Sequence, residues 1–253
     1  MITPKITQLN RDLIFRYLGF QSRGLFDMGR ADHLSRLQEQ ITRCGEMVLS
    51  ISDVRCVYRI HPVSSILLDR DLEEDPDAPS KVLRLEGNDI RRLLDGADEV
   101  VLMALTLGAD LERLLMREEV TDMSDAMVLD VCASAAVESA ADDFEAKLSQ
   151  ELLAEGKYLT NRFSPGYGDL PLHTQRPLLS HLNASRAIGV TLTPTNLMVP
   201  RKSVTAIMGI CDHIKEQTLG GCGSCPLKTK CTYRAHHMRC YDMEQAKDCR
   251  KQS

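Results

Sequence analysis

The sequence predicts an α+β fold: a twisted, largely antiparallel sheet with flanking helices, followed by a Cys-rich C-terminal appendage. Helix-like and strand-like stretches are mixed along the chain without the regular βαβ alternation of a Rossmann fold. The last two strand candidates lie on either side of Pro200, a spacing typical of a hairpin. Periodicity weakens from Gly220 onward, where five of the nine cysteines are gathered.

The helices are predicted from apolar residues that recur at helical spacing. In the second helix, Leu34, Leu37 and Ile41 share one face. Asn88 is a favourable N-cap residue for the third. Gly156 ends the longest helix, whose Ala-rich centre lets another element approach closely. The expected helices cover residues 10–18, 31–49, 88–94, 109–118, 124–154 and 174–182.

The strands are predicted from short apolar runs between turn signals. The most apolar of them, residues 100–107, is expected to be buried. An acidic stretch that contains proline, residues 71–79, is expected to form a loop. The expected strands cover residues 54–60, 82–85, 100–107, 158–161, 197–199 and 203–210.

Charge and hydropathy exclude two classes of partner. The formal net charge of −5 leaves no basic footprint of the kind that nucleic-acid binding requires. The longest uncharged apolar run, residues 100–109, is shorter than the about 20 residues of a membrane-spanning helix. The first residues have no apolar core of a secretory signal. We therefore expect a cytoplasmic protein that binds neither nucleic acid nor membrane.

The composition predicts one main domain over residues 1–212, with a helical N-terminal part, and a tail over residues 213–253. From Cys222 onward the tail carries seven Lys or Arg against three Asp or Glu, so it is basic although the whole chain is acidic.

A loop after the predicted strand at residues 158–161 holds the strongest candidate for a binding site. Pro165 restricts its own backbone φ angle, whereas Gly166 can adopt φ values that other residues avoid. This pair favours a tight turn whose N–H groups face a cleft. Arg162 supplies a planar fork for a carboxylate or phosphate. Tyr167 can lie along an apolar or cationic ligand group. The alternative is a surface loop with a solvated arginine.

The order of residues around this loop resembles the activation domain of cobalamin-dependent methionine synthase. Arg-x-x-Pro-Gly-Tyr is followed by a Pro-containing stretch and by His-Thr at the start of a helix. The resemblance covers roughly residues 80 to 212, including the strand-to-helix step at residues 101–111. It rests mainly on Arg162, Pro165, Gly166, Tyr167, Pro171, His173 and Thr174.

The resemblance implies an S-adenosylmethionine groove on a twisted antiparallel sheet. Arg162 would pair with the carboxylate of the ligand, N–H groups near Gly166 would add hydrogen bonds, and Glu138 would hold the cationic end. The alternative for Glu138 is an ordinary exposed helix carboxylate. His173 would meet the edge of a corrinoid, or else it is a solvent-exposed or helix-capping histidine. The aromatic residues that the family places near its C-terminus have no clear match; Tyr233 and Tyr241 are the candidates.

Cysteines in the tail have the spacing of metal ligands. Two residues separate Cys222 from Cys225, and five more separate Cys225 from Cys231. We favour a 4Fe-4S cluster with Cys240, rather than Cys249 or Cys211, as the fourth ligand. The alternatives are a zinc site and thiols that bind no metal. Three other cysteines lie in apolar patterns and are expected in the core: Cys44, Cys56 and Cys132.

The resemblance implies a reactivation protein for a separate corrinoid-dependent methionine synthase or a related corrinoid protein. It would bind S-adenosylmethionine and support reductive methylation of cob(II)alamin by positioning the methyl donor, without a catalytic nucleophile or base. The electron would come from the cluster, or from a flavodoxin or ferredoxin. The alternative is a docking or S-adenosylmethionine-sensing module without turnover, with a structural metal in its tail.

Overall fold

The computed structural model describes residues 2–19, 31–68 and 83–214. Within these ranges the main sheet has the strand order β1-β4-β8-β5, and every neighbouring pair is antiparallel. The predicted α+β class with an antiparallel sheet is therefore confirmed. The four strands are β1 (Arg55–Pro62), β4 (Glu99–Thr106), β8 (Ser203–Cys211) and β5 (Tyr158–Leu159).

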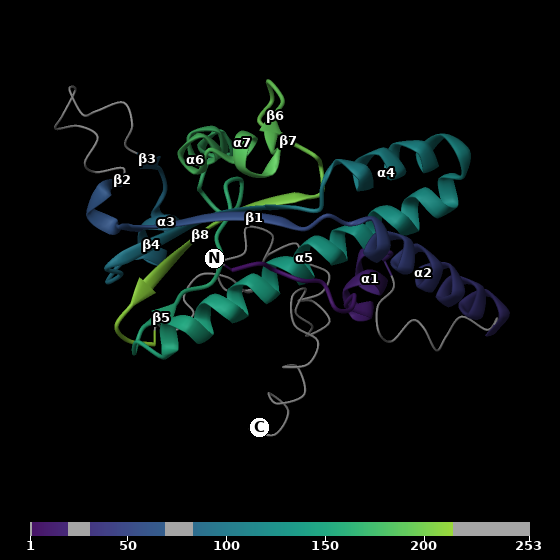
Figure 1. Cartoon of the computed structure of the whole chain (residues 1–253), viewed down its shortest axis with the longest axis horizontal. Coiled ribbons are helices and arrows are strands. Elements are labelled where there is room, and N and C mark those ends of the chain that lie inside the picture. The colour runs from purple at the N-terminus through teal and green to yellow at the C-terminus, as the bar shows by residue number, and fades with distance from the viewer. Residues whose placement is uncertain (1, 20–30, 69–82, 215–253) are drawn as a thin grey trace.

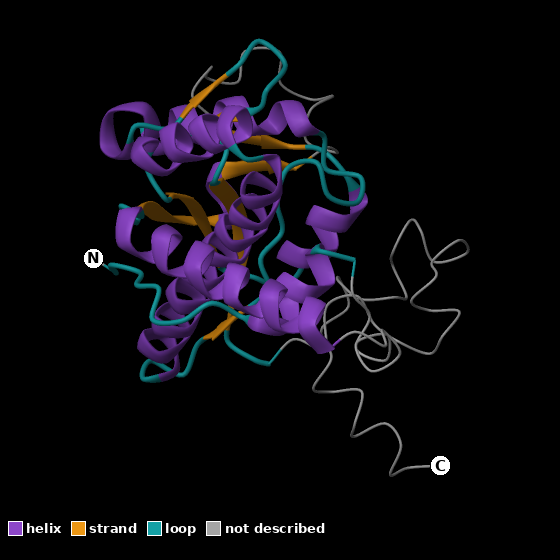
Figure 2. Cartoon of the chain, turned by 90° about the vertical axis from the view of Figure 1, so that its right-hand side faces the viewer, coloured by secondary structure: helices purple, strands orange, loops and turns teal. Residues whose placement is uncertain are grey.

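Helices cover both faces of the sheet (Figure 1; Figure 2). On one face lie α1 (Arg11–Tyr17), α2 (Ala31–Ile51), α4 (Ala109–Thr121) and α5 (Met123–Leu153). On the other lie α3 (Asn88–Leu94), α6 (Gln175–Leu182) and α7 (Ala184–Ile188). Two small sheets complete the described part: β2 (Ile66–Leu68) with β3 (Leu83–Leu85), and β6 (Thr191–Leu192) with β7 (Met198–Val199). The described residues also include the 3-10 turns η1 (Val63–Ser65) and η3 (Leu172–Thr174).

The two central strands separate the two hydrophobic cores. Alternate residues of β4 face opposite sides, because side chains in a strand alternate. Met103 and Leu105 pack in the core under α5, whereas Leu102 and Ala104 pack in the core under α6 and α7. The uninterrupted apolar run at residues 100–107 therefore reflects a strand that is buried on both faces.

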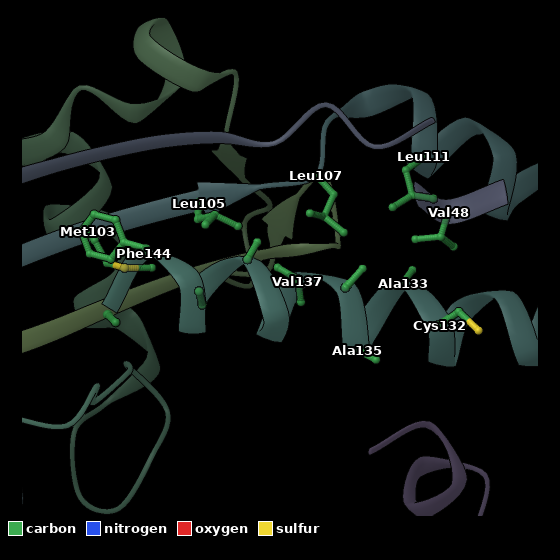
Figure 3. Packing of buried hydrophobic residues seen from close by; sticks show 14 of the residues in the cluster. Val48, Met103, Leu105, Leu107, Leu111, Cys132, Ala133, Ala135, Val137 and Phe144 are labelled. Carbon is green, nitrogen blue, oxygen red and sulfur yellow. The ribbon is translucent and has the colours of Figure 1, made fainter. Parts of the chain in front are cut away.

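The long helix α5 is the support for one core, and its small residues explain how closely it is packed. Ala133, Ala136 and Ala140 are fully buried, and α5 contacts α2, α4 and the sheet. Figure 3 shows Phe144 of α5 beside Met103 of the sheet. The ring of Phe144 also meets that of Tyr58 edge to face, with 5.1 Å between the centroids. The predicted close approach at the Ala-rich centre of α5 is confirmed.

Residues 2–10, called the N-terminal strap here, lie against α5. The backbone N–H of Lys5 donates to Asp143 Oδ2 at 2.8 Å, and Lys147 Nζ donates to the carbonyl of Thr3 at 3.0 Å. Ile2 is buried in the same core as the α5 alanines. Asn10 caps α1 by accepting a hydrogen bond from the N–H of Leu13. The contacts of Lys5 and Thr3 fix the strap against α5.

Two local predictions are wrong. Residues 198–199 pair with residues 191–192 rather than with β8, so the hairpin around Pro200 does not form. β8 is instead a central strand, because its nine largely buried residues need the long strand β4 as a partner. Asn88 does not cap α3 with its side chain; Gly87 holds the cap position. The loop expected at residues 71–79 lies outside the described residues.

None of the helices in the described ranges is both long enough and apolar enough to cross a membrane.

Candidate functional site

Arg162 lies where the chain leaves β5 and continues along β8. The next residue, Phe163, forms two backbone hydrogen bonds with Ile207 of β8, with N···O distances of 3.0 and 2.8 Å. Because side chains alternate along extended chain, Arg162 is directed toward α5 while Phe163 packs against the opposite core. The sheet therefore fixes the backbone from which the guanidinium reaches α5.

Three carboxylates from successive turns of α5 surround the Arg162 guanidinium. Its Nη2 lies 2.6 Å from Asp142 Oδ1 and 3.5 Å from Glu138 Oε2, and its Nε lies 3.4 Å from Glu145 Oε2. We call these four residues the acid cluster. The spacing of four and three residues puts the three acids on one helix face. When all are ionised, three acids against one guanidinium leave an excess of negative charge, which the charge of Arg16 partly offsets at Glu138.

Burial shapes the electrostatics of the acid cluster. The Arg162 side chain is 18% exposed. Burial raises the pKa of Glu138 and of Glu145, and the charge of Asp142 raises both further, while Arg162 acts in the opposite direction. The Nη1 atom of Arg162 is buried and has no hydrogen-bond partner among the described residues. A buried donor of this kind indicates a missing acceptor.

Two tyrosines flank the acid cluster. The pKa of Tyr17, at the end of α1, is raised first by burial and then by the negative charge of Glu138, with smaller contributions from Tyr167 and Asp142. Tyr17 is 46% exposed and Tyr167 is 66% exposed, so both rings keep a free face. The sequence prediction missed Tyr17, because nothing in the pattern of residues 10–18 marks that ring as close to the loop at residue 162.

The loop forms a closed turn rather than a cradle of free donors. Gly166 has φ +91°, a conformation that glycine adopts easily. Its N–H donates to the carbonyl of Leu170 at 2.9 Å, and the N–H of Tyr167 donates to Ser164 at 3.0 Å. The expectation that these N–H groups face a ligand is therefore wrong. The turn presents the Tyr167 ring instead, and Pro165 is buried beneath it.

Asp169 anchors the same loop to α3. Its Oδ2 accepts from the N–H of Asn88 at 2.7 Å, and its Oδ1 accepts from the N–H of Asp89 at 3.0 Å. A Cβ at Gly87 would lie 2.6 Å from Asp169 Oδ1, so glycine is required for this close approach. The carboxylate thus supplies the helix cap that the sequence assigned to Asn88.

His173 lies in η3 beyond this turn. Its side chain is 61% exposed, and its Nε2 lies 3.7 Å from Glu86 Oε1. The structure therefore places His173 near the loop but outside the acid cluster.

An open cleft of 690 Å³ adjoins the acid cluster. The N-terminal strap, the start of α1 and α2 supply most of its lining. Ser139 and Asp142 of α5 lie at one end. Asp142 therefore belongs both to the cleft and to the acid cluster.

The predicted metal ligands Cys222, Cys225, Cys231 and Cys240 lie outside the described residues, as do Tyr233 and Tyr241. In the described ranges, no group of three or more His, Cys, Asp or Glu side chains is arranged to hold a metal ion. Burial raises the pKa of the thiols of Cys44, Cys56 and Cys132, to about 11, 12 and 12. Their predicted place in or against the core is confirmed.

Comparison with known proteins gives two findings. Residues 95–224, just over half of the chain, match the family described as vitamin B12 dependent methionine synthase, activation domain. Among solved structures, the crystal structure of the MetH reactivation domain bound to AdoHcy superposes with a TM-score of 0.55 at 15% sequence identity, covering 95% of this chain and 90% of that one. At that identity the likeness concerns the fold. No curated protein matches the sequence.

Proposed function

Because the chain belongs to the activation-domain family of vitamin B12 dependent methionine synthase, we propose that it binds S-adenosylmethionine and serves a corrinoid-dependent methionine synthase as its reactivation protein. Residues 1–212 act as one unit in this proposal, since the N-terminal strap and β8 share a core. The structural neighbour bound to AdoHcy, the product of methyl transfer, supports the choice of ligand.

The observation that carries the proposal is the acid cluster. S-adenosylmethionine carries two positive groups, an ammonium and a sulfonium, and one negative group, a carboxylate. Its net charge is therefore positive. Glu138 and Asp142 provide an excess of negative charge for the cationic groups. Half-burial of Glu138 strengthens such an attraction, because screening by water is weaker there.

The unpaired Nη1 of Arg162 supports a site for the ligand carboxylate. This donor is buried and has no acceptor in the described part of the chain. A carboxylate of the ligand supplies the acceptor, with a charge-assisted hydrogen bond. Arg162 then has two functions: it holds the three helix acids together, and it orients the amino-acid end of the ligand.

The role of the Pro165-Gly166-Tyr167 turn is to position the ring of Tyr167. Pro165 and Gly166 set the turn, and the exposed ring of Tyr167 lies beside the acid cluster, where a π face favours a sulfonium methyl group. His173, exposed on the far side of the turn, faces the corrinoid partner. The roles of these residues are positional, and the reaction requires no acid or base from this chain.

The corrinoid would be held by the partner and, when reduced, would supply the nucleophile that takes the methyl group from the sulfonium, leaving the electron pair of the broken carbon–sulfur bond on sulfur. If Cys222, Cys225, Cys231 and Cys240 hold a cluster, that cluster would supply the electron; otherwise a flavodoxin or ferredoxin would supply it. Positioning of the methyl group over the metal is the contribution of this chain.

Titration calorimetry with S-adenosylmethionine tests the binding step. We expect binding by the unaltered protein and at least tenfold weaker binding by Arg162→Gln, with Arg176→Gln as the exposed control. Absence of binding by the unaltered protein contradicts the proposal.

Reactivation is tested by adding the protein, a low-potential reductant and S-adenosylmethionine to cob(II)alamin-stalled methionine synthase. Return of the methylated absorbance spectrum is the expected result. Binding without any such return would favour the docking or sensing module instead.

A further inference from the structure

The strand β1 forms one edge of the main sheet, and its outer side has no partner strand in the described part of the chain. It pairs with β4 from Arg55, opposite Thr106, to Pro62, opposite Glu99 (Figure 1). Its 8 residues exceed the length of a typical strand, about 5–6 residues. The edge is therefore long enough to accept an added strand.

The register shows which backbone groups of β1 point away from β4. The N–H of Val63, directly after the strand, donates to the carbonyl of Asp98 at 3.0 Å. Because hydrogen-bonded positions alternate along an antiparallel strand, the odd-numbered residues of β1 bond to β4. The N–H and C=O groups of Cys56, Tyr58 and Ile60 therefore face outward. They form no backbone hydrogen bond with any residue in the ranges 2–19, 31–68 and 83–214.

Two kinds of side chain border this open edge. Cys56, Tyr58 and Ile60 lie on the side of α5, where the first two pack against the core and Ile60 is 38% exposed. Arg55 and Arg59 are exposed on the opposite side, because side chains alternate along a strand. The edge thus has apolar side chains on one side and basic side chains on the other.

Arg59 carries the free charge of the basic side. Arg55 is paired with Asp53, and the ring of His61 packs against that of His181, with 4.8 Å between the centroids. Burial, followed by the charges of His181 and Arg59, lowers the pKa of His61, so this ring is neutral near pH 7. Arg59 forms no ion pair with any residue that the structure describes. Its guanidinium is therefore available to a carboxylate of another chain.

We propose that the open edge of β1 binds an extended segment of a partner protein in which acidic and apolar side chains alternate. The backbone of that segment completes the hydrogen bonds of Cys56, Tyr58 and Ile60, which is how peptides add a strand to a sheet edge. Its acidic side chains lie beside Arg59 and its apolar side chains beside Ile60.

Charge argues for a different protein rather than a second copy of this chain. Antiparallel pairing of two β1 strands would put the basic side chains of both copies on the same face of the joined sheet, where like charges repel. The acid cluster lies toward the other edge of the sheet, where Arg162 follows β5. The inference therefore does not depend on the proposed function.

Amide hydrogen exchange, followed by NMR, tests whether the edge is open. In the free protein, the N–H groups of Cys56, Tyr58 and Ile60 should exchange much faster than those of Val57 and Arg59, which bond to β4. Protection of all five groups at every protein concentration overturns the inference, because the chain then covers its own edge. Protection that rises with protein concentration overturns it in favour of a second copy.

The binding probe is a fluorescent, end-capped peptide of the sequence Thr-Glu-Val-Glu-Val-Glu-Thr, and its charge-reversed control has Lys in place of each Glu. Fluorescence anisotropy is measured at low ionic strength, because salt screens the attraction. We expect the acidic peptide to bind at least tenfold more tightly than the control and to protect the amides of Cys56, Tyr58 and Ile60. No binding, or equal binding of the two peptides, contradicts the inference.

Two variants locate the probe on β1. Ile60→Pro removes an outward N–H but no bond to β4, and proline is tolerated at such positions of an edge strand. It should weaken binding of the acidic peptide at least tenfold, whereas Ile60→Val keeps the N–H and should stay within twofold. Circular dichroism checks that both variants are folded.

Arg59→Glu should reverse the preference between the two peptides. Arg36→Glu makes the same charge change at an exposed position of α2 and should leave the preference as it is. An unchanged preference in Arg59→Glu, or an unchanged affinity in folded Ile60→Pro, means that the peptide binds elsewhere and overturns the inference.

Discussion

The carboxylate of Asp169 accepts hydrogen bonds from the first turn of α3, at 2.7 Å from the backbone nitrogen of Asn88. A second bond joins it to the N–H of Asp89 at 3.0 Å. Through this contact the loop that carries Arg162 and Tyr167 is attached to the face of the sheet opposite α5. The loop is therefore held by both layers of helices.

Loss of this cap should destabilise the protein and loosen the loop together. For Asp169→Ala we expect a decrease of about 1 kcal/mol in the free energy of unfolding, the usual cost of losing an N-cap. Urea denaturation measures it. Glu151→Ala removes an exposed carboxylate of α5 and is the control. An unchanged midpoint for Asp169→Ala would show that the cap is dispensable.

The affinity for S-adenosylmethionine should fall as the pH is lowered toward the pKa of Glu138. Burial raises this pKa, so Glu138 takes up a proton at a higher pH than an ordinary glutamate and loses its attraction for the cationic ligand. Calorimetry between pH 8 and about pH 5 measures the fall. The Glu138→Gln variant should bind weakly with a flatter pH profile; an equally steep profile would assign the titration to another group.

The raised pKa of Glu145 predicts that protein stability falls as the pH rises, whereas the affinity for S-adenosylmethionine is expected to rise with pH. Because the folded protein binds this proton more tightly than the unfolded chain, the contribution of Glu145 to stability declines as the pH rises from the ordinary glutamate pKa of about 4.3 to the raised value. The stability of the unaltered protein relative to Glu145→Gln should decline over that window. Chemical denaturation at a series of pH values tests it, and a rising difference would contradict the assignment.

Enlarging a small residue of α5 should disturb the core. Ala140 is fully buried, so Ala140→Leu is expected to cost about 1–3 kcal/mol through overpacking. The exposed Ala146→Leu on the same helix is the control and should change stability little. Thermal unfolding compares the two; equal melting temperatures would mean that the core has unused space.

The spacing of the tail cysteines predicts a bound metal that is lost when one of its cysteine ligands is substituted. A 4Fe-4S cluster gives the anaerobically purified protein a brown colour, which Cys225→Ser should remove or sharply reduce. Cys249→Ser, outside the preferred set of ligands, is the control. A colourless protein with stoichiometric zinc would favour the alternative metal.

Much of the fold was predictable because periodicity reports burial directly. The burial of the strand at residues 100–107 and the close packing at the small residues of α5 are properties of single segments, and both predictions are confirmed. Partners were harder to predict. The sequence around Pro200 is compatible with a hairpin, and only the full sheet shows that β8 pairs with β4 instead.

The sequence marked Arg162 and Glu138 as candidate site residues, and the structure brings these two side chains together. The motif at Arg162 is local, but the clustering of Glu138, Asp142 and Glu145 depends on the distance between α5 and β5, which no local pattern encodes. The same holds for Tyr17, which approaches the cluster through the packing of α1. The roles of all these residues in ligand binding stay predictions.

The central place of β8 has a consequence for how the protein is made. β8 lies between β4, about one hundred residues earlier, and β5, about fifty residues earlier, so neither neighbour can complete its hydrogen bonds before residues 203–211 leave the ribosome. Until then the edges of β4 and β5 are open to pairing with other chains. Slow, chaperone-sensitive maturation and aggregation of truncated products are expected from this order of synthesis.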